Sequence, residues 1–161
     1  QRRHIQSGES PDYSRKGVLV ATLNKYNCFA QDVGRGVHNL NADALKVALT
    51  NTAPNASTHA LLSDITELGA GNGYSAGGNT PTNSGYAQTS GVGKLTLVDT
   101  VFTASGGSIG PFRYAVLYNS TPSSPLKPLI GYADYGSSIT LLVGETFTTD
   151  FDGSAGGLTI T

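Results

Sequence analysis

Two serines lie in the pattern Gly-x-Ser-x-Gly, which in α/β-hydrolases holds the catalytic nucleophile on a sharp turn. Ser75 is the centre of residues 73–77, and Ser108 is the centre of residues 106–110. Such a turn follows a strand and begins a helix, but the first match lies in a Gly-rich stretch, and Pro111 and a strand pattern follow the second. Because the chain holds 21 Gly among 161 residues, chance matches are expected. We therefore expect no catalytic serine and no enzyme.

The residues that bind metals or form disulfides are few and scattered. The histidines show no His-x-His or His-x-x-x-His spacing and stand in three different contexts, at His4, His38 and His59. Cys28 is the only cysteine, which excludes an internal disulfide and a cysteine-based metal cage. Asp150 and Asp152 could bind calcium, but their loop has no further acidic residue, so a hydrogen-bonded turn is the better interpretation. We expect neither a metal nor a cofactor.

Nucleotide and nucleic-acid binding find little support in the sequence. Residues 91–94, Gly-Val-Gly-Lys, are similar to the end of a phosphate-binding loop, but Leu95 stands where that loop needs Ser or Thr. The formal net charge of −1 is divided between a basic part, residues 1–40 with net +3, and an acidic part, residues 41–161 with net −4. The N-terminal basic residues are too few and too separated to track a nucleic acid. They could instead dock on an acidic neighbour, including another copy of the chain.

Composition predicts one domain of turn-rich β structure. Charged residues make up only 13% of the chain, while Gly, Ser and Thr are abundant, which is typical of β proteins with hydroxyl and amide surfaces. A chain of 161 residues is about the size of one domain with an independent core. No apolar run approaches the ~20 residues that a membrane-spanning helix needs, so we expect no membrane partner.

The N-terminal part divides into an arm and a helix. We expect residues 1–20 to form an extended basic arm, because residues 1–17 have no hydrophobic periodicity and only the isolated apolar residues Ile5 and Tyr13. Apolar residues then recur every three or four positions, which predicts one amphipathic helix over residues 21–40. A single domain, residues 21–161, contains this helix and the strands that follow it.

The rest of the chain predicts an antiparallel β-sandwich, of the jelly-roll or Ig-like type. A central buried strand is predicted at residues 112–118, because this stretch is rich in aromatic and branched side chains. Turn signals bound about eight strands, at 45–50, 86–90, 94–104, 112–119, 128–135, 138–142, 145–151 and 157–161. Residues 69–85 form a long Gly/Asn/Ser loop, which is either functional or held by a neighbouring segment.

The order of several motifs resembles a family of small virion structural proteins of tailed bacteriophages. The likeness covers about residues 21–161, and the basic arm is not part of it. The family supplies no catalytic residues. The motifs that carry the likeness lie at residues 38–40, 45–54, 64–65, 70–78, 97–107, 113–119 and 128–136.

The resemblance implies a non-enzymatic head decoration or cement protein, which binds the phage major capsid protein on the outer surface of the virion head and stabilises the shell. Capsid lattices offer threefold sites, so a homo-oligomer, with a trimer favoured, is expected. The alternative is a tail, baseplate or fibre component that binds a host surface, which would favour exposed aromatic clusters in the loops. The expected partner-contact residues lie in the arm and beside the long loop: Arg2, Arg3, Tyr13, Arg15, Lys16, Tyr74 and Tyr86.

Overall fold

The computed structural model describes residues 15–20, 22–152 and 157–161. Arg2, Arg3 and Tyr13, three of the expected contact residues, lie outside this part of the chain. The elements, in chain order, are β1 (Arg15–Val20), β2 (Asn24–Lys25), α1 (Asn27–Gly34), β3 (Leu45–Thr50), the 3-10 turn η1 (Leu62–Asp64), β4 (Asn83–Thr89), β5 (Val92–Leu97), β6 (Thr100–Thr103), β7 (Ile109–Asn119), β8 (Leu129–Leu141), β9 (Thr146–Asp150) and β10 (Leu158–Ile160).

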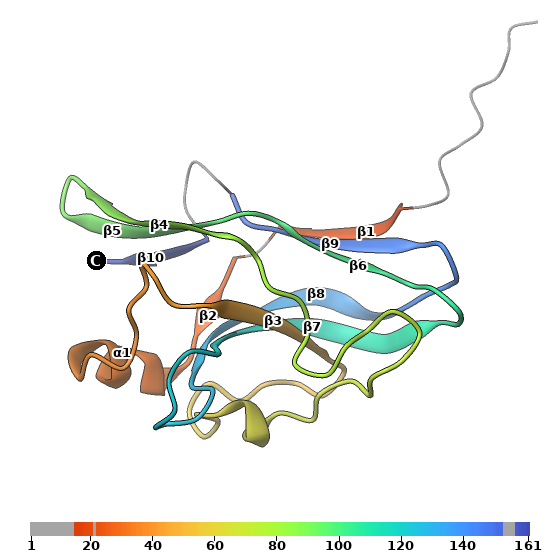
Figure 1. The fold of residues 1–161 in the computed structure, drawn as a ribbon, viewed down its shortest axis with the longest axis horizontal. Helices are drawn as coiled ribbons and strands as arrows, with labels where there is room; N and C mark the ends of the chain where they lie inside the picture. The colour runs from red at the N-terminus through yellow and green to blue at the C-terminus, as the bar shows by residue number, and fades with distance from the viewer. Residues whose placement is uncertain (1–14, 21, 153–156) are drawn as a thin grey trace, which may run out of the picture.

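The strands form three sheets that lie in two layers (Figure 1). The upper layer in the figure holds two three-stranded sheets, with strand orders β1-β9-β6 and β10-β5-β4. The lower layer is the four-stranded sheet β2-β8-β7-β3. In the described part of the chain, β1 and β9 are parallel and all other paired strands are antiparallel. The prediction of a mainly β, largely antiparallel fold is thus confirmed.

The main hydrophobic core lies between the two layers. Phe102 and Phe147 point inward from the upper layer and Phe112 from the lower, and each is at most 1% exposed. The rings of Phe112 and Phe147 meet edge to face, with centroids 5.0 Å apart. Because large aromatic rings bury much apolar area in such contacts, these residues account for a large share of the cohesion between the layers.

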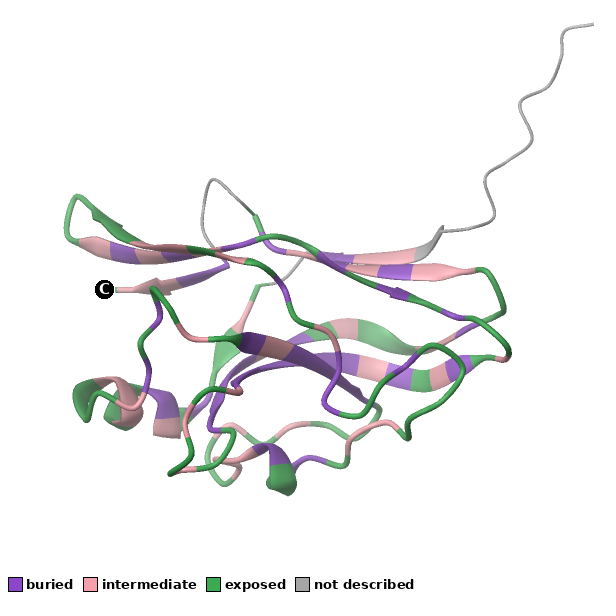
Figure 2. Cartoon of the chain, in the orientation of Figure 1, coloured by how far each residue is buried: buried purple, intermediate pink, exposed green. Residues whose placement is uncertain are grey.

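The outer face of the four-stranded sheet carries a second core, which we call the covered face. It consists of Tyr26, Ala48, Val116, Tyr118 and Leu129, on which Leu62 and Ile65 pack from the segment between β3 and β4. Asp64 fixes this segment, since its Oδ2 accepts hydrogen bonds from the backbone N–H groups of Ala60 (2.8 Å) and Leu61 (2.9 Å). Figure 2 shows this lower side with buried residues on both the sheet and the segment beneath it.

The long Gly/Asn/Ser loop is held by the protein's own strands. Val47 and Asn79 exchange backbone hydrogen bonds of 2.8 and 3.0 Å, which attach the loop to β3. The side-chain amide of Asn79 donates to the carbonyl of Val101 in β6 (2.8 Å). Gly78 has φ 71° and lies so close to β3 that a Cβ would overlap the Val47 carbonyl. The loop therefore joins the two layers along one side.

The predicted helix over residues 21–40 is too long, because Asn27–Gly34 is the only helical part of residues 22–40. The start of the predicted span pairs with β8 as strand β2, and the Tyr26 N–H donates to the Ile130 carbonyl (3.1 Å). The helix ends at Gly34, and the chain then turns away at Gly36, whose φ of 71° suits glycine. Strand pairing with β8 and the glycines at positions 34 and 36 therefore make the helix shorter than the apolar periodicity predicts.

Several strand boundaries also differ from the prediction. The predicted strand 94–104 is two strands, β5 and β6, interrupted at Val98 and Asp99. The predicted strands 128–135 and 138–142 are one strand, β8, which continues through Gly136 at φ 94°. Residues 15–20, assigned to the arm from the sequence, form β1 and pair with β9.

Candidate interaction surface

The outer face of the β1-β9-β6 sheet is uncovered by any described segment, and we call it the bare face. Its outward positions alternate with buried ones, as Figure 2 shows along these strands. Val18, Thr148 and Val101 are cross-strand neighbours and form a row across the three strands. Val101 is 48% exposed, and the adjacent Val98 is 51% exposed. The other outward positions are Thr103, Thr146 and Asp150.

This composition suits contact with a protein surface. Threonine and valine favour a pleated sheet and present a flat surface of methyl and hydroxyl groups. When another surface covers a surface with few charges, the cost in desolvation free energy is small. Sequence reasoning missed this face because alternation predicts which residues point outward but not whether another segment covers them. Arg15 and Lys16, expected as contacts, are the first two residues of β1 and so lie at one end of this sheet.

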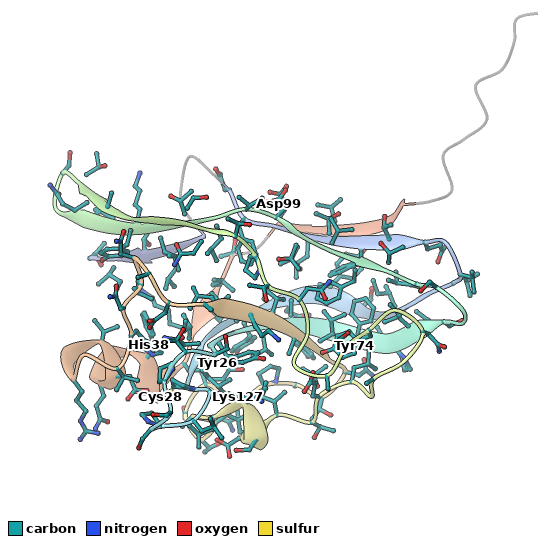
Figure 3. All side chains as sticks on the ribbon, viewed as in Figure 1. Tyr26, Cys28, His38, Tyr74, Asp99 and Lys127 are labelled. Atoms are coloured by element: carbon teal, nitrogen blue, oxygen red, sulfur yellow. The ribbon has the colours of Figure 1, made fainter. Side chains whose placement is uncertain are left out.

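Tyr74, expected as a surface contact, is buried at 3% exposure. Its ring stacks on Phe102, with centroids 5.9 Å apart. Its hydroxyl donates to Oε1 of Glu67 (2.7 Å) and accepts from the Leu49 N–H (3.0 Å). Burial raises the pKa of Tyr74 far above the ordinary value for tyrosine. The residue therefore anchors the loop, and the expectation that it offers its ring to a partner does not fit this geometry (Figure 3).

Tyr86, the other expected aromatic contact, is half-buried. It packs against the main core, and its hydroxyl lies over Gly93 of the neighbouring strand, where a Cβ would overlap it. Tyr118 lies on the covered face and donates to the carbonyl of Gly77 (2.7 Å). Burial raises the pKa of Tyr118 to about 12. Tyr74, Tyr86 and Tyr118 are all packing residues with a polar tip.

The two serine motifs do not form a nucleophile turn. Ser75 lies in the loop between η1 and β4, and Ser108 directly precedes β7, so neither stands between a strand and a helix. Both serines are exposed. This geometry lacks the strand-turn-helix context in which the motif activates a serine.

His38 is the centre of a buried polar cluster beside the covered face. Its Nδ1 lies 3.1 Å from Nδ2 of Asn119, which also donates to Oδ2 of Asp43 (2.6 Å). The ring of Phe29 packs on the imidazole, with centroids 5.3 Å apart. Burial lowers the pKa of His38, against the opposing effect of Asp32 and Asp43. The cluster therefore favours the neutral imidazole and joins α1, β7 and the segment before β3.

The best-defined ion pair lies on the four-stranded sheet. Nε and Nη2 of Arg113 donate to the two carboxylate oxygens of Asp134 at 2.7 and 2.8 Å. The hydrogen bond from Arg113 is the main reason that the pKa of Asp134 is lowered. The guanidinium also lies 5.2 Å from the ring centroid of Tyr114. Since both charged side chains are more than a third exposed, solvent screens the pair, and it contributes little to stability.

A pocket of about 460 Å³ lies between α1 and the end of β10. Among the described residues that line it, Lys25 carries the one charged side chain, and its Nζ donates to the Thr159 carbonyl (2.9 Å). The pocket suits apolar contact better than acid-base chemistry. Its remaining lining residues are Tyr26, Asn27, Phe29, Ala30, Val33, Ile160 and Thr161.

No group of three or more His, Cys, Asp or Glu side chains in the described part of the chain is placed to hold one metal ion. None of the described helices is long and apolar enough to cross a membrane. No family model, curated protein or solved structure matches this chain.

Proposed function

We propose that the chain is a structural protein of a tailed bacteriophage virion, most specifically a head decoration protein. It binds the major capsid protein on the outer surface of the head and stabilises the shell, and it acts as a homo-oligomer without catalysing a reaction. The resemblance of its sequence motifs to those of small phage virion proteins supports the class. The observation that carries the proposal is the bare face, which offers a flat protein-binding surface on a well-packed body.

The two layers suit this role if they act as one β-sandwich, which we include in the proposal. Aromatic contacts across the main core and the loop along β3 and β6 hold the layers together. A cement protein adds stability through many weakly polar contacts, and such contacts gain most from a surface that is ordered before binding. The hydrogen-bonded sheet under the bare face provides that order.

The alternative, a tail, baseplate or fibre component that binds a host surface, would use aromatic side chains exposed in loops. The tyrosines next to the long loop do not serve this purpose, since Tyr74 is buried and Tyr86 packs against the core. Their placement favours the head over the tail.

Immunogold labelling of intact particles with an antibody against this chain tests the proposal. We expect label over the head, and particles from a gene deletion serve as the unlabelled control. Those deletion particles should lose DNA at a lower temperature than wild type while adsorbing to cells at the same rate. Label confined to the tail, or lost adsorption with unchanged head stability, would overturn the head role.

A further inference from the structure

We propose that protonation of His38 releases a polar connection between the two layers, so that the β10-β5-β4 sheet loosens while the four-stranded sheet stays folded. The connection is the segment of residues 38–44, which we call the bridge segment. Figure 1 shows the chain between α1 and β3 rising from the lower layer to the upper one and returning. The inference goes beyond the proposed function and does not rest on it.

The bridge segment is bound to the end of β7 in the lower layer. The N–H of Ala44 donates to Oγ1 of Thr121 (2.8 Å). The Ala44 carbonyl accepts from both the N–H (2.9 Å) and the hydroxyl (2.7 Å) of Ser120. Asn119, the last residue of β7, donates through Nδ2 to Oδ2 of Asp43 (2.6 Å). These hydrogen bonds fix the segment on the lower layer.

The same segment holds β4 in the upper layer. Nδ2 of Asn83 donates to the carbonyls of Leu40 (2.9 Å) and Asp43 (3.3 Å). The N–H of Tyr86 donates to Oδ1 of Asn41 (3.2 Å). Asn83 and Tyr86 both belong to β4. If the bridge segment moves, β4 therefore loses these three hydrogen bonds together.

The orientation of the Asn119 amide is fixed by its partners. Its Oδ1 accepts from the Thr121 N–H (3.0 Å), and its Nδ2 donates to the Asp43 carboxylate. Nδ2 also faces Nδ1 of His38, 3.1 Å away, so Nδ1 is the unprotonated nitrogen that accepts. The proton of the neutral imidazole is then on Nε2, which is buried and has no hydrogen-bond partner among the described residues.

The imidazolium ion does not fit this arrangement. In the charged ring both nitrogens are donors, so Nδ1–H would point at the amide N–H groups of Asn119. Turning the amide would not help, because Oδ1 would then face the Asp43 carboxylate and Nδ2 would face the Thr121 N–H. Protonation therefore separates His38 from Asn119. Because Asp43 is bound to the same amide and to Asn83, this movement reaches β4.

The groups that face the His38 ring set the pH at which it is protonated. Asp32 from α1 and Asp43 from the bridge segment favour the charged form, whereas β7 contributes the uncharged Asn119. The ring of Phe29 packs on the imidazole, and His38 is only 8% exposed. Burial has the larger effect and lowers the pKa of His38. In the released segment the pKa returns to about 6.5, so a fall in pH below that value favours release.

Hydrogen–deuterium exchange of the full chain, read by mass spectrometry at pH 7.5 and pH 5, tests the proposal. After correction for the intrinsic effect of pH on exchange, peptides from the bridge segment and β4 should exchange faster at pH 5. The increase should not exceed about thirtyfold, since the released state binds one extra proton with a pKa of about 6.5. Peptides from the centres of β7 and β8 should keep their protection.

His38→Gln is the test variant, because the Gln side chain offers an amide oxygen that accepts hydrogen bonds and does not titrate in this range. Its bridge segment and β4 should exchange at the same corrected rate at both pH values. His59→Gln is the matched control, since Nδ1 of His59 also accepts a hydrogen bond, from the Asn55 N–H (3.2 Å), but lies outside the bridge segment. This control should keep the pH dependence of the wild type.

Equal corrected exchange of the wild type at both pH values would overturn the proposal. So would faster exchange of the bridge segment with unchanged β4, loss of protection over the whole chain, or an unaltered pH dependence in His38→Gln. Titration of the His38 ring by NMR tests the proposal without a variant, because a folded pKa at or above about 6.5 would contradict it. None of these measurements uses virions, so the head-labelling experiment remains a separate test of the proposed function.

Discussion

The outer faces of the two layers differ in whether another segment of the chain covers them. Both faces present a valine, Val116 on the covered face and Val101 on the bare face. Burial alternates along β6 and β9 under the bare face, whereas β7 is buried at every position from Tyr114 to Asn119. Val116 is 0% exposed because the segment between β3 and β4 packs over it, whereas Val101 is 48% exposed. The difference comes from the connections, since β3 and β4 are joined by a long segment while only Val98 and Asp99 separate β5 from β6. Whether the outer face of a sheet is buried therefore depends on the loops that connect its strands.

Truncation of a covered-face leucine should have the largest effect. Leu129→Ala removes a fully buried side chain, and we expect the free energy of unfolding to fall by about 2–5 kcal/mol, since the surrounding structure relaxes only partly around the cavity. Leu142→Ala, at a leucine that is 57% exposed, should change it by under ~0.5 kcal/mol. Urea denaturation measures both. Equal losses would mean that the covered face is not a second core.

Removal of the Tyr74 hydroxyl tests the loop that runs along β3 and β6. Tyr74→Phe leaves the buried N–H of Leu49 without its acceptor, and we expect a loss of about 1–3 kcal/mol in urea denaturation. Tyr86→Phe, at a half-buried tyrosine, is the matched control and should be nearly neutral. A neutral Tyr74→Phe would mean that the hydrogen bonds of the Tyr74 hydroxyl do not hold the loop in place.

The cluster around His38 should make stability depend on pH. Because the folded pKa is lowered, the neutral form is favoured in the folded state. Its contribution is complete above the unfolded pKa of about 6.5 and is lost as the pH falls through the folded pKa. We therefore expect the free energy of unfolding, measured by urea denaturation, to be lower at pH 5 than at pH 7.5 because of this residue. His38→Gln should flatten that part of the profile, and an unchanged pH dependence would contradict the assignment.

The smallest expected change is at the centre of the bare face. Val101→Ala should alter the unfolding free energy of the monomer by under ~0.5 kcal/mol. Val116→Ala should cost about 2 kcal/mol, since it removes two fully buried carbons worth roughly 0.8 kcal/mol each and leaves a cavity. Thermal unfolding of dilute protein compares the two. Similar losses at both positions would show that some segment covers the bare face after all.

The parts of the fold that the sequence predicts correctly are those that a local pattern of residues determines. β3 was predicted with its observed bounds because Leu45, Val47 and Leu49 alternate with polar or small residues. β1 was not predicted, because its pairing partner, β9, lies near the other end of the chain and Arg-Lys-Gly is not a typical strand sequence. The helix was overpredicted because the residues around Tyr26 carry an apolar periodicity that pairing with β8 overrides.

The candidate surface was less predictable than the fold. The sequence singles out Arg15 and Lys16 for their charge and predicts that they belong to an arm, whereas they are the first two residues of β1. Tyr74 was singled out as an aromatic residue in a Gly-rich loop. The glycines in that loop allow the backbone to approach β3 and turn the ring inward, which no local pattern reveals. Burial of this kind depends on which distant strand the loop meets.

The parallel pairing of β1 with β9 also sets the order in which the chain can assemble during synthesis. β1 is made early, but its partner emerges only after nearly all the other described strands. Contacts between such distant segments form slowly, because the chain must lose the entropy of closing a long loop before the contact can stabilise it. Until β9 is made, β1 has none of the described strands to pair with. Completion of the β1-β9-β6 sheet is therefore one of the last steps open to the described chain as it folds.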